Sequence, residues 1–514
     1  MKPINLHQAA SRPLAVANEL TGGIVDADSV FSKTVVLTGD ANALRNENGR
    51  WCLLDALRLL SRVAGYVLVV LPDGCDTSAA EVLELAPTLW SRHEIVVQRG
   101  LISPAIANAD AVLFVGNEVR PGAKWTAIRA QGWTAHCSSQ GDLDGDNNQA
   151  NPIASMMAAS LGVTEIFKHL YNVPASAAPP LDRGHVNLFD FRAGPESSIG
   201  PELPRNLPLP DTALIGGGAI GNAIALLLSQ LPVLGRMHIV DKQVFGDENL
   251  GTCVLLDHTA WLGQPKAECL ANWLNRHSSL EVTGKQEFIA EAIAAGPLRE
   301  RPIELVLNGL DDIAARHDAQ RIWATTTIDG ALNSVGAAVV THRVDHPESA
   351  CLRCAFRLPA ENVLESQVRL TGLALDALAG DQGRLLSDED ITAAEPTRQA
   401  WLREQRKAGR TLCSVIAVAQ AEKALGIHLE DGFRPSVPFV ASAAAALVIA
   451  QMVKVLVCPD AEQVHTFQLG NLFLGPEARA AARRRADPAC ECVRHRRRIL
   501  ALQDRRRSGP WSAI

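Results

Sequence analysis

The sequence predicts an α/β fold built from two related, doubly wound lobes, with a small helical insertion in the second. Three observations indicate this arrangement. Short apolar runs alternate with longer helical stretches on both sides of a proline-rich segment at 174–210. The last apolar helix is similar in both halves, and a glycine-rich loop follows the first strand of the second half. Such alternation is typical of a parallel sheet covered by helices on both faces.

The first half contains four apolar runs of strand length, at 35–37, 67–70, 95–97 and 111–115. More polar, helical stretches separate them, and an alanine-rich helix at 151–170 follows. We expect residues 1–173 to form one lobe. Closely spaced prolines interrupt regular structure, so residues 174–210 are expected to form a surface linker.

The second half repeats this order, with strands expected at 212–215, 237–240 and 304–307. A polar stretch at 358–413 interrupts it before a second alanine-rich helix. We therefore expect the second lobe in two parts, at 211–357 and 414–478, around this insertion. A basic tail at 479–514 completes the chain.

An internal repeat supports two lobes. Residues 152–168 and 438–454 align without a gap, sharing a proline, two alanines, a leucine and a lysine. Residues 111–118 also resemble residues 305–312. Repeated units of this kind indicate two copies of one fold. Chance similarity between two alanine-rich helices is the alternative.

Composition and charge exclude several classes of protein. Hydrophobic residues make up 47% and charged residues 20% of the chain, which excludes wholesale disorder and a coiled coil. A net charge of −7 argues against a general nucleic-acid binder, although 11 arginines against three acidic residues make 479–507 basic. We expect this tail to be a solvated, mobile terminus; attraction of acidic partners or nucleic acid is the alternative.

Cysteine usage and the apolar runs indicate a cytoplasmic protein. The chain has 11 cysteines and its N-terminal residues 1–20 lack the apolar core of a secretory signal. Reduced thiols are therefore expected, and clustered cysteines then indicate metal binding or catalysis. The apolar run at 439–458 contains polar residues and is expected to be a buried helix rather than a membrane span.

The glycine-rich loop predicts a nucleotide site in the second half. Gly216 permits a tight turn, Gly218 lets a phosphate approach the backbone, and Gly221 lets helix and strand pack closely. About 20 residues later the next strand ends at Asp241, which can accept both hydrogen bonds of a ribose. The first half has only Thr-Gly-Asp at 38–40, so we expect no nucleotide there.

The nucleotide is expected to be magnesium-ATP. Asn249 lies in the loop after Asp241, Lys266 begins the next helix, and Asp311 follows the third strand. A lysine at a helix start suits a β- or γ-phosphate, and an aspartate at a strand end can hold magnesium. A nicotinamide cofactor needs neither. Taken singly, Lys266 could be an ordinary surface lysine and Asp311 an ordinary helix-capping aspartate. The order of these residues along the chain, together with Asp241 and Asn249, favours ATP.

Two close pairs of cysteines predict a structural zinc site. The residues are Cys351, Cys354, Cys490 and Cys492. Four thiolates form a closed tetrahedral site with no open position for catalysis. His495 is an alternative ligand, and unrelated free thiols are the competing interpretation.

These motifs resemble the adenylation domain of ubiquitin-activating enzymes and their ThiF/MoeB relatives. The similar residues, in order and spacing, are Gly216, Gly218, Gly221, Asp241, Asn249-Leu250, Gly263, Pro265-Lys266-Ala267 and Asp311. The resemblance covers about 211–357 and 435–475. It implies an inactive lobe paired with an active one, and ATP-dependent adenylation of the C-terminal glycine of a ubiquitin-like protein, with Lys266 and Asp311 at the catalytic centre.

The resemblance also implies a catalytic cysteine. Cys413 stands where the family places the cysteine that forms a thioester and passes the partner to a conjugating enzyme. Arg410 nearby favours the thiolate. Cys253 is the main rival, and an inert, buried Cys413 is the competing interpretation.

Some residues depart from the family pattern. Gln243 replaces an aspartate, and Thr252-Cys253 replaces Arg-Gln, which removes an arginine that contacts ATP phosphates. Arg12 of the first lobe is a candidate to replace it. These departures leave two alternatives: an adenylating enzyme without a thioester relay, acting on a sulfur carrier or peptide, and a nucleotide-binding scaffold that has lost catalysis.

Too little chain follows residue 475 for a separate ubiquitin-fold domain. This compact form resembles the activating enzymes of bacterial ubiquitin-like conjugation operons, which are often linked to antiviral defence. The expected partners are a ubiquitin-like protein and a conjugating enzyme. No membrane and no specific nucleic acid are expected as partners.

Overall fold

The computed structural model describes most of the chain and divides it into two compact units. The first comprises Met1–Ala355 with Ser436–Ile514, and the second comprises Phe356–Pro435. The described residues are 4, 6–100, 106–118, 124–140, 143, 149–193, 200–295, 298, 302–356, 363–380, 384–412, 414–416, 418–419, 436–458, 466–482 and 485–508. The second unit contains the insertion expected at 358–413 and extends to residue 435.

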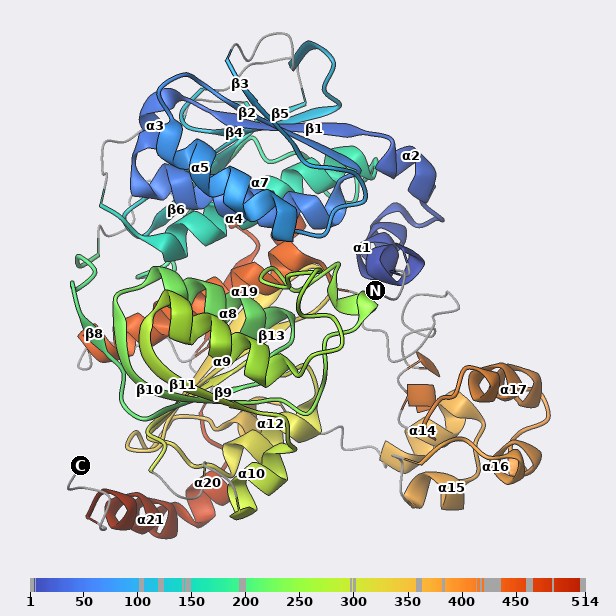
Figure 1. Cartoon of the computed structure of the whole chain (residues 1–514). Helices are drawn as coiled ribbons and strands as arrows, with labels where there is room; N and C mark the ends of the chain where they lie inside the picture. Colours follow the sequence, from blue (N-terminus) through green and yellow to red (C-terminus); the bar gives the residue numbers. More distant parts are fainter. Residues whose placement is uncertain are drawn as a thin grey trace. The chain divides into compact units, whose positions relative to one another are not determined.

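The first lobe of the larger unit contains a seven-stranded sheet (Figure 1) in the order β3-β2-β1-β4-β5-β6-β7. Its strands are β1 (Thr34–Gly39), β2 (Tyr66–Leu71), β3 (Val96–Arg99), β4 (Ala111–Val115), β5 (Trp125–Gln131), β6 (Thr134–Ser138) and β7 (Arg183–Asn187). Neighbouring strands from β3 to β5 are parallel, whereas β6 is antiparallel to both β5 and β7. Its helices are α1 (Leu6–Thr21), α2 (Ala27–Phe31), α3 (Ala41–Arg45), α4 (Glu47–Val63), α5 (Asp76–Leu85), the 3-10 helix η1 (Ala86–Thr88) and α7 (Pro152–Leu170).

The second lobe has the same strand order, β11-β10-β9-β12-β13-β14-β15, extended by β16 at one edge and by the short β8 beside β10. Its strands are β8 (Leu207–Pro208), β9 (Thr212–Ile215), β10 (Val233–Val240), β11 (Ser279–Lys285), β12 (Leu305–Asn308), β13 (Thr326–Leu332), β14 (Ala337–Arg343), β15 (Thr466–Leu469) and β16 (Arg479–Ala482). Its helices are α8 (Ala219–Gln230), η2 (Asp247–Asn249), α9 (Lys266–His277), α10 (Ile289–Ala295), α12 (Ile313–Gln320), α13 (Leu352–Ala355), α19 (Pro438–Val457), η3 (Leu472–Leu474), α20 (Glu491–Arg494) and α21 (Arg496–Ser508). Equal strand order in both lobes confirms the predicted pair of doubly wound lobes.

The two lobes pack through their central helices. Helix α7 of the first lobe lies against α4 and α19, and α19 of the second lobe lies against α8. These are the two alanine-rich helices of the internal repeat, and their small side chains let the helix backbones approach closely. In the described part of the chain, α19 alone is long and apolar enough to cross a membrane, and 83% of that apolar stretch is buried inside the protein.

A lysine in a buried ion pair on α7 also contacts the second lobe. Lys168 of α7 lies 2.6 Å from Glu165, and its ammonium donates to the backbone carbonyls of Pro179 and Phe473 at 2.7 and 3.0 Å. Both charged side chains are at most 4% exposed. Because Phe473 belongs to the second lobe, this lysine fixes η3 against α7.

The lysine at the matching position of the repeat makes the reciprocal contact. The ammonium of Lys454 in α19 lies 4.5 Å from the ring centre of Phe191 and 5.5 Å from that of Phe189. Both rings follow β7 of the first lobe, so each repeat helix ends in a lysine that contacts the other lobe. Cations over aromatic faces are attracted to them, most strongly where water is excluded.

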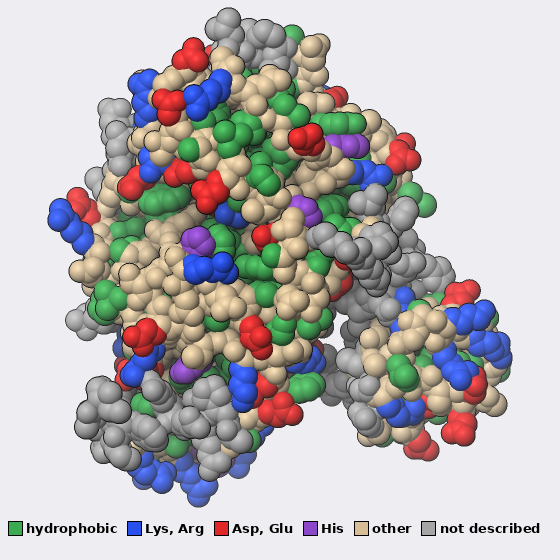
Figure 2. Space-filling view, viewed as in Figure 1, with side chains coloured by type: hydrophobic (Ala, Val, Ile, Leu, Met, Phe, Trp, Pro, Cys, Tyr) green, Lys and Arg blue, Asp and Glu red, His purple; other side chains and the backbone are tan. Residues whose placement is uncertain are grey.

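Two segments differ from their expected structure. The linker expected at 174–210 contributes β7 and β8. Pro208 lies within β8, and the N–H groups of its neighbours Leu207 and Leu209 pair with the Pro232 and Leu234 carbonyls. The basic tail expected to be mobile contains β16, α20 and α21. Its Gln503 donates to the Trp323 carbonyl at 2.9 Å, and Ile499 is buried. Basic side chains gather along the lower edge of the larger unit (Figure 2), where α21 lies.

The smaller unit contains four described helices: α14 (Val363–Thr371), α15 (Leu375–Ala379), α16 (Asp388–Ala393) and α17 (Gln399–Lys407). They enclose a separate apolar core that includes Leu373, Trp401 and Leu412. Arg384 forms two hydrogen bonds to Asp390, at 2.6 and 2.7 Å, beside the start of α16. A core and an ion pair of its own allow this unit to hold its shape independently.

Replacing Glu165 by glutamine should lower the free energy of unfolding by about 3 kcal/mol, because it leaves the Lys168 ammonium buried without a counter-charge. Chemical denaturation followed by circular dichroism measures this change. Asp76→Asn is the matched control, since its ion pair with Arg99 is exposed and should contribute less than about 1 kcal/mol. Equal losses in both variants would contradict a stabilising role of the buried Glu165–Lys168 pair.

Candidate functional site

The glycine-rich loop between β9 and α8 has an open helix N-terminus. Gly216 has φ +89°, a left-handed conformation that favours glycine. A Cβ on Gly221 would lie 1.9 Å from the Gly216 carbonyl oxygen, so only glycine fits there. At Gly218 an added Cβ would meet no atom within 4 Å, and no side chain caps α8. The first N–H groups of α8 therefore remain available to an anion.

Asp241 lies beside this loop, at the end of β10. Its carboxylate accepts hydrogen bonds from the Gly217 N–H at 2.6 Å and from the Gln243 N–H at 2.7 Å. Each carboxylate oxygen retains a further lone pair for a ligand hydroxyl. The position and orientation of the Asp241 carboxylate thus suit the predicted contact with a ribose.

Lys266 begins α9 and contacts the same loop. A Cβ on Gly217 would lie 3.1 Å from Lys266 Cβ and 3.5 Å from Asp241 Oδ2, which brings the three residues together. The Lys266 side chain is 3% exposed, and Nζ donates to Gln243 Oε1 at 2.8 Å. This neutral amide orients the ammonium without cancelling its charge, and no described carboxylate forms an ion pair with it. The charge therefore suits an anionic ligand.

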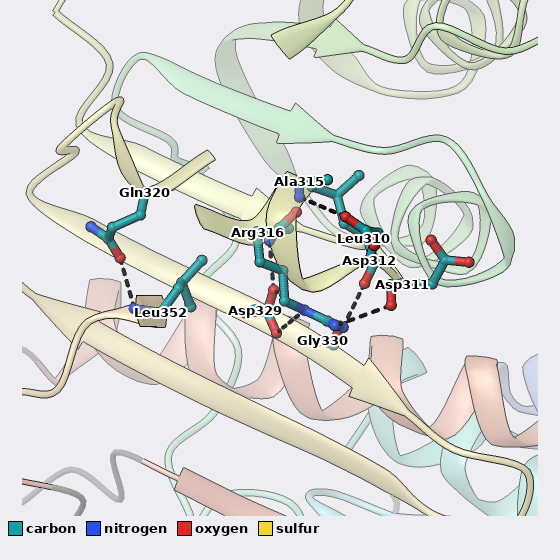
Figure 3. A network of polar contacts seen from close by, with 10 residues as sticks. Leu310, Asp311, Asp312, Ala315, Arg316, Gln320, Asp329, Gly330 and Leu352 are labelled. Carbon is teal, nitrogen blue, oxygen red and sulfur yellow. Dashed lines mark hydrogen bonds and ion pairs between the residues drawn. The ribbon is translucent and has the colours of Figure 1, made fainter. Parts of the chain in front are cut away.

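Asp311 follows β12 in a loop on the other side of the glycine-rich turn. A Cβ on Gly216 would lie 3.1 Å from Leu310, so the two loops are in contact. Asp311 is exposed, and Figure 3 shows its carboxylate directed away from a buried network beneath the loop. Asp312 instead caps α12 through the Ala315 N–H at 2.8 Å. The two neighbouring aspartates thus differ: Asp312 caps a helix, whereas Asp311 faces solvent.

Arg316 forms the buried network that holds this loop. Its Nε lies 3.1 and 3.2 Å from the two oxygens of Asp329, and its Nη2 donates to the carbonyls of Leu310 and Gly330 (Figure 3). Nη1 donates to the Asp311 carbonyl at 3.4 Å. Burial raises the pKa of Asp329 to about 7, while Arg316 opposes this rise. The sequence analysis did not predict this pair. The signals that could have indicated it are an arginine on the inner side of α12 and an aspartate within the apolar strand β13.

The predicted Asn249 is the last residue of η2, and the loop that follows contains Thr252 and Cys253, which depart from the family pattern. Asn249 is buried, and its Oδ1 accepts from the Gly246 N–H at 3.0 Å, which shows a role in shaping the turn. Helix α1 packs on this loop, since a Cβ on Gly251 would lie 2.3 Å from the Ala9 carbonyl oxygen. Burial raises the pKa of Cys253, against the nearby charges of Lys266 and Arg12. Arg12 therefore lies near enough to Cys253 for its charge to affect this thiol.

The two predicted nucleophiles have different surroundings. Cys413 lies outside the described residues. Its neighbours Leu412 and Ser414 are helical, and the Ser414 N–H donates to Thr411 Oγ1 at 3.3 Å, as at a helix start. Cys253 is fully buried and its raised pKa disfavours the thiolate.

Four cysteines form the one cluster of metal-binding groups among the described residues. Sγ–Sγ distances are 3.8 Å for Cys351–Cys354 and 3.6 Å for both Cys351–Cys490 and Cys354–Cys492. Thiolates at about 2.3 Å around one tetrahedral zinc are about 3.8 Å apart, so the cluster fits this ion. The Cys351 thiol donates to Cys354 and lowers the pKa of Cys354. His495 is exposed and not a member.

The loop of the first lobe that corresponds to the glycine-rich loop has a different helix start. There Asp40 caps α3, and its carboxylate accepts from the Ala43 N–H at 2.6 Å. A negative side chain therefore occupies the position that is open at Gly218 in the second lobe.

Comparisons with known proteins give two family matches. The family described as "ThiF family" matches residues 198–492, and the "BilD N-terminal domain" matches residues 34–179. The second match agrees with the resemblance to activating enzymes of bacterial ubiquitin-like operons. No curated protein matches the chain.

Solved structures of E. coli MccB are also similar. One of MccB alone has 12% identity and a TM-score of 0.35, and covers 55% of this chain and 64% of MccB. One of MccB with ATP has 14% identity and a TM-score of 0.34, and covers 55% and 65%. The chain thus spans less than two thirds of these proteins. Because the ThiF match extends over more than half of the chain and contains the glycine-rich loop, Asp241, Lys266 and Asp311, the protein belongs to the ThiF family.

Proposed function

We propose that the protein is an ATP-dependent activating enzyme for a ubiquitin-like protein. The observation that carries this proposal is the uncapped N-terminus of α8, with a buried Lys266 beside it whose charge no described carboxylate cancels. Such a site favours a polyphosphate. Membership of the ThiF family supports adenylation as the reaction.

Each residue has a role in the proposed first step. The partner's C-terminal carboxylate attacks the α-phosphorus of ATP, which forms an acyl adenylate and releases pyrophosphate. Asp241 binds the ribose, the N–H groups at Gly218 bind phosphate, and Lys266 stabilises charge on the β- and γ-phosphates. Asp311 would hold magnesium, which neutralises phosphate charge. Arg12, whose charge opposes the rise in the pKa of Cys253 that burial causes, is our candidate to replace the arginine that the family has at Thr252.

In the second proposed step the Cys413 thiolate attacks the acyl carbon and displaces AMP, which leaves a thioester for transfer to a conjugating enzyme. The buried Cys253 supports this assignment because it is a poor thiolate. The cysteine cluster fits a structural zinc that joins the tail to the second lobe. We place the protein in the cytoplasm, where these thiols stay reduced.

Adenylation without a thioester relay is the second candidate, since membership of the ThiF family supports adenylation alone. Under that function the activated partner passes directly to a sulfur donor or amine. A requirement for Cys413 distinguishes the two functions. A catalytically inactive scaffold would bind ATP without pyrophosphate exchange.

Asp311→Ala should reduce partner-dependent ATP–pyrophosphate exchange about a hundredfold or more, because phosphate charge loses its counter-ion anchor. The assay uses radiolabelled pyrophosphate and the purified ubiquitin-like partner. Asp40→Asn is the matched control: it alters the equivalent loop of the first lobe while keeping a capping oxygen, so exchange should remain near the wild-type rate. A dead Asp40→Asn variant with an active Asp311→Ala variant would reverse the assignment of the lobes.

Cys413→Ala should keep pyrophosphate exchange and lose the partner adduct that reducing agent cleaves on a gel. Adenylation needs only the nucleotide site, whereas the thioester needs a thiolate. Cys253→Ala is the control and should retain the adduct. An adduct lost only in Cys253→Ala would transfer the role to Cys253, and exchange without an adduct on any cysteine would favour the relay-free enzyme.

The purified chain should contain about one zinc, because four thiolates lie at tetrahedral spacing. Cys351→Ser and Cys490→Ser should each lose the metal and lower the Tm, since structural zinc contributes directly to folding. Metal analysis by mass spectrometry and thermal unfolding measure both effects. Cys458→Ser, outside the cluster and partly exposed, should change neither. Full zinc content in both cluster variants would exclude the site.

A further inference from the structure

A second group of buried charges lies between the two lobes, on α4. Asp55, Arg58 and Arg62 are spaced i, i+3 and i+7, so they share one side of this helix. Arg62 is 1% exposed and Asp55 is fully buried. Charged side chains are rarely buried to this extent unless they are paired or hydrogen-bonded. The contacts of Arg62 explain its position.

Every nitrogen of the Arg62 guanidinium forms a hydrogen bond. Nε and Nη2 donate to the Cys253 carbonyl at 3.2 and 2.8 Å, and Nη2 also donates to the Val254 carbonyl at 3.2 Å. Nη1 donates to the Arg58 carbonyl at the preceding turn and to Ser61 Oγ at 2.8 Å. The planar fork of an arginine thus joins α4 of the first lobe to two consecutive carbonyls of the second.

Neighbouring residues add to this contact. Arg58 Nη1 lies 3.4 Å from the Val254 carbonyl oxygen. Asp55 Oδ1 accepts from Gln230 Nε2 at 3.4 Å, where α8 ends. The C-terminal end of α8 and residue 254 are therefore both in contact with α4.

The two carbonyls belong to the loop that borders the nucleotide site. Thr252, where the family has its phosphate-contacting arginine, directly precedes them. The next N–H, of Leu255, donates to Asn222 Oδ1 at 2.5 Å, and the Asn222 N–H donates to the Gly218 carbonyl in the first turn of α8. A short path of hydrogen bonds thus connects Arg62 to the phosphate-binding end of α8. The positive charges of Lys266 and Arg12 oppose the rise in the pKa of Cys253 that burial causes.

We propose that Arg62 is a positioning residue through which the lobe without a nucleotide site holds residues 252–255 in the conformation that receives ATP. This inference rests on the proposed ATP site. Two carbonyls in a buried turn need donors, and water is excluded there. A misplacement of about 1 Å would move Thr252 and the α8 N-terminus out of register with the phosphates. The first lobe therefore has a role in nucleotide binding without contacting the nucleotide.

The test compares Arg62→Met, Arg62→Lys and Glu165→Gln in the full chain. Isothermal titration with ATP gives Kd, pyrophosphate exchange gives KM and kcat, and thermal unfolding gives Tm. Arg62→Met should raise Kd and KM for ATP about tenfold or more, with a smaller change in kcat, because bound and transition states lose the same contacts. Arg62→Lys keeps one donor group and should restore part of the affinity.

Glu165→Gln is the matched control because it weakens the interlobe contact away from the loop. It should lower Tm and leave KM for ATP within twofold of wild type. Unchanged ATP affinity in Arg62→Met, or an equal loss in Glu165→Gln, would overturn the positioning role. If Arg62→Met does not fold, unchanged affinity in Arg62→Lys overturns it. A wild-type chain that binds no ATP would refute the proposed function itself.

Discussion

The packing of α7 against α19 is the contact on which the two-lobe arrangement depends. Both helices are almost completely buried and rich in alanine, so they pack closely while each also covers the sheet of its own lobe. Separating the lobes would expose both apolar surfaces to water. The lysine at the end of each helix then contacts the opposite lobe, which fixes the relative position of the sheets. This packing also places helices α1 and α4 against residues 251–254 of the second lobe.

Within this symmetric scaffold the chemistry is asymmetric. A capping carboxylate occupies the α3 start of the first lobe, whereas the α8 start of the second lobe is open at Gly218. The second lobe also contains two kinds of buried positive charge, one paired with a carboxylate and one not. Arg316 and Asp329 neutralise each other under the Asp311 loop, which makes that loop rigid. Lys266 is oriented by a neutral glutamine and retains its charge for a ligand.

The cysteine cluster connects the C-terminal helices to the second lobe. Cys351 directly precedes α13 and Cys354 lies in it, while Cys490 caps α20 and Cys492 lies in that helix. In the following helix α21, Arg496 donates to the Asp345 carbonyl at 2.9 Å and Ile499 is buried. The tail is therefore an ordered part of the lobe. Its local composition, dominated by arginine, predicted a mobile terminus. Composition could not predict the order of this segment, because the thiols that come together in the cluster are more than 130 residues apart in the sequence.

The sequence by itself determined the α/β class, the two related lobes, the glycine-rich nucleotide loop and the four clustered cysteines. These features depend on local periodicity, turn chemistry and residue spacing, all of which are visible in short stretches of chain. Antiparallel strands such as β7 were not predicted because they are short and lack an apolar run. Only the tertiary structure decided the long-range polar contacts beside the glycine-rich loop: Arg316 beneath Asp311, and Arg62, which is 191 residues from the carbonyl it binds. Such contacts form when the lobes pack and bury polar groups that must then be paired, and no local pattern specifies the partner.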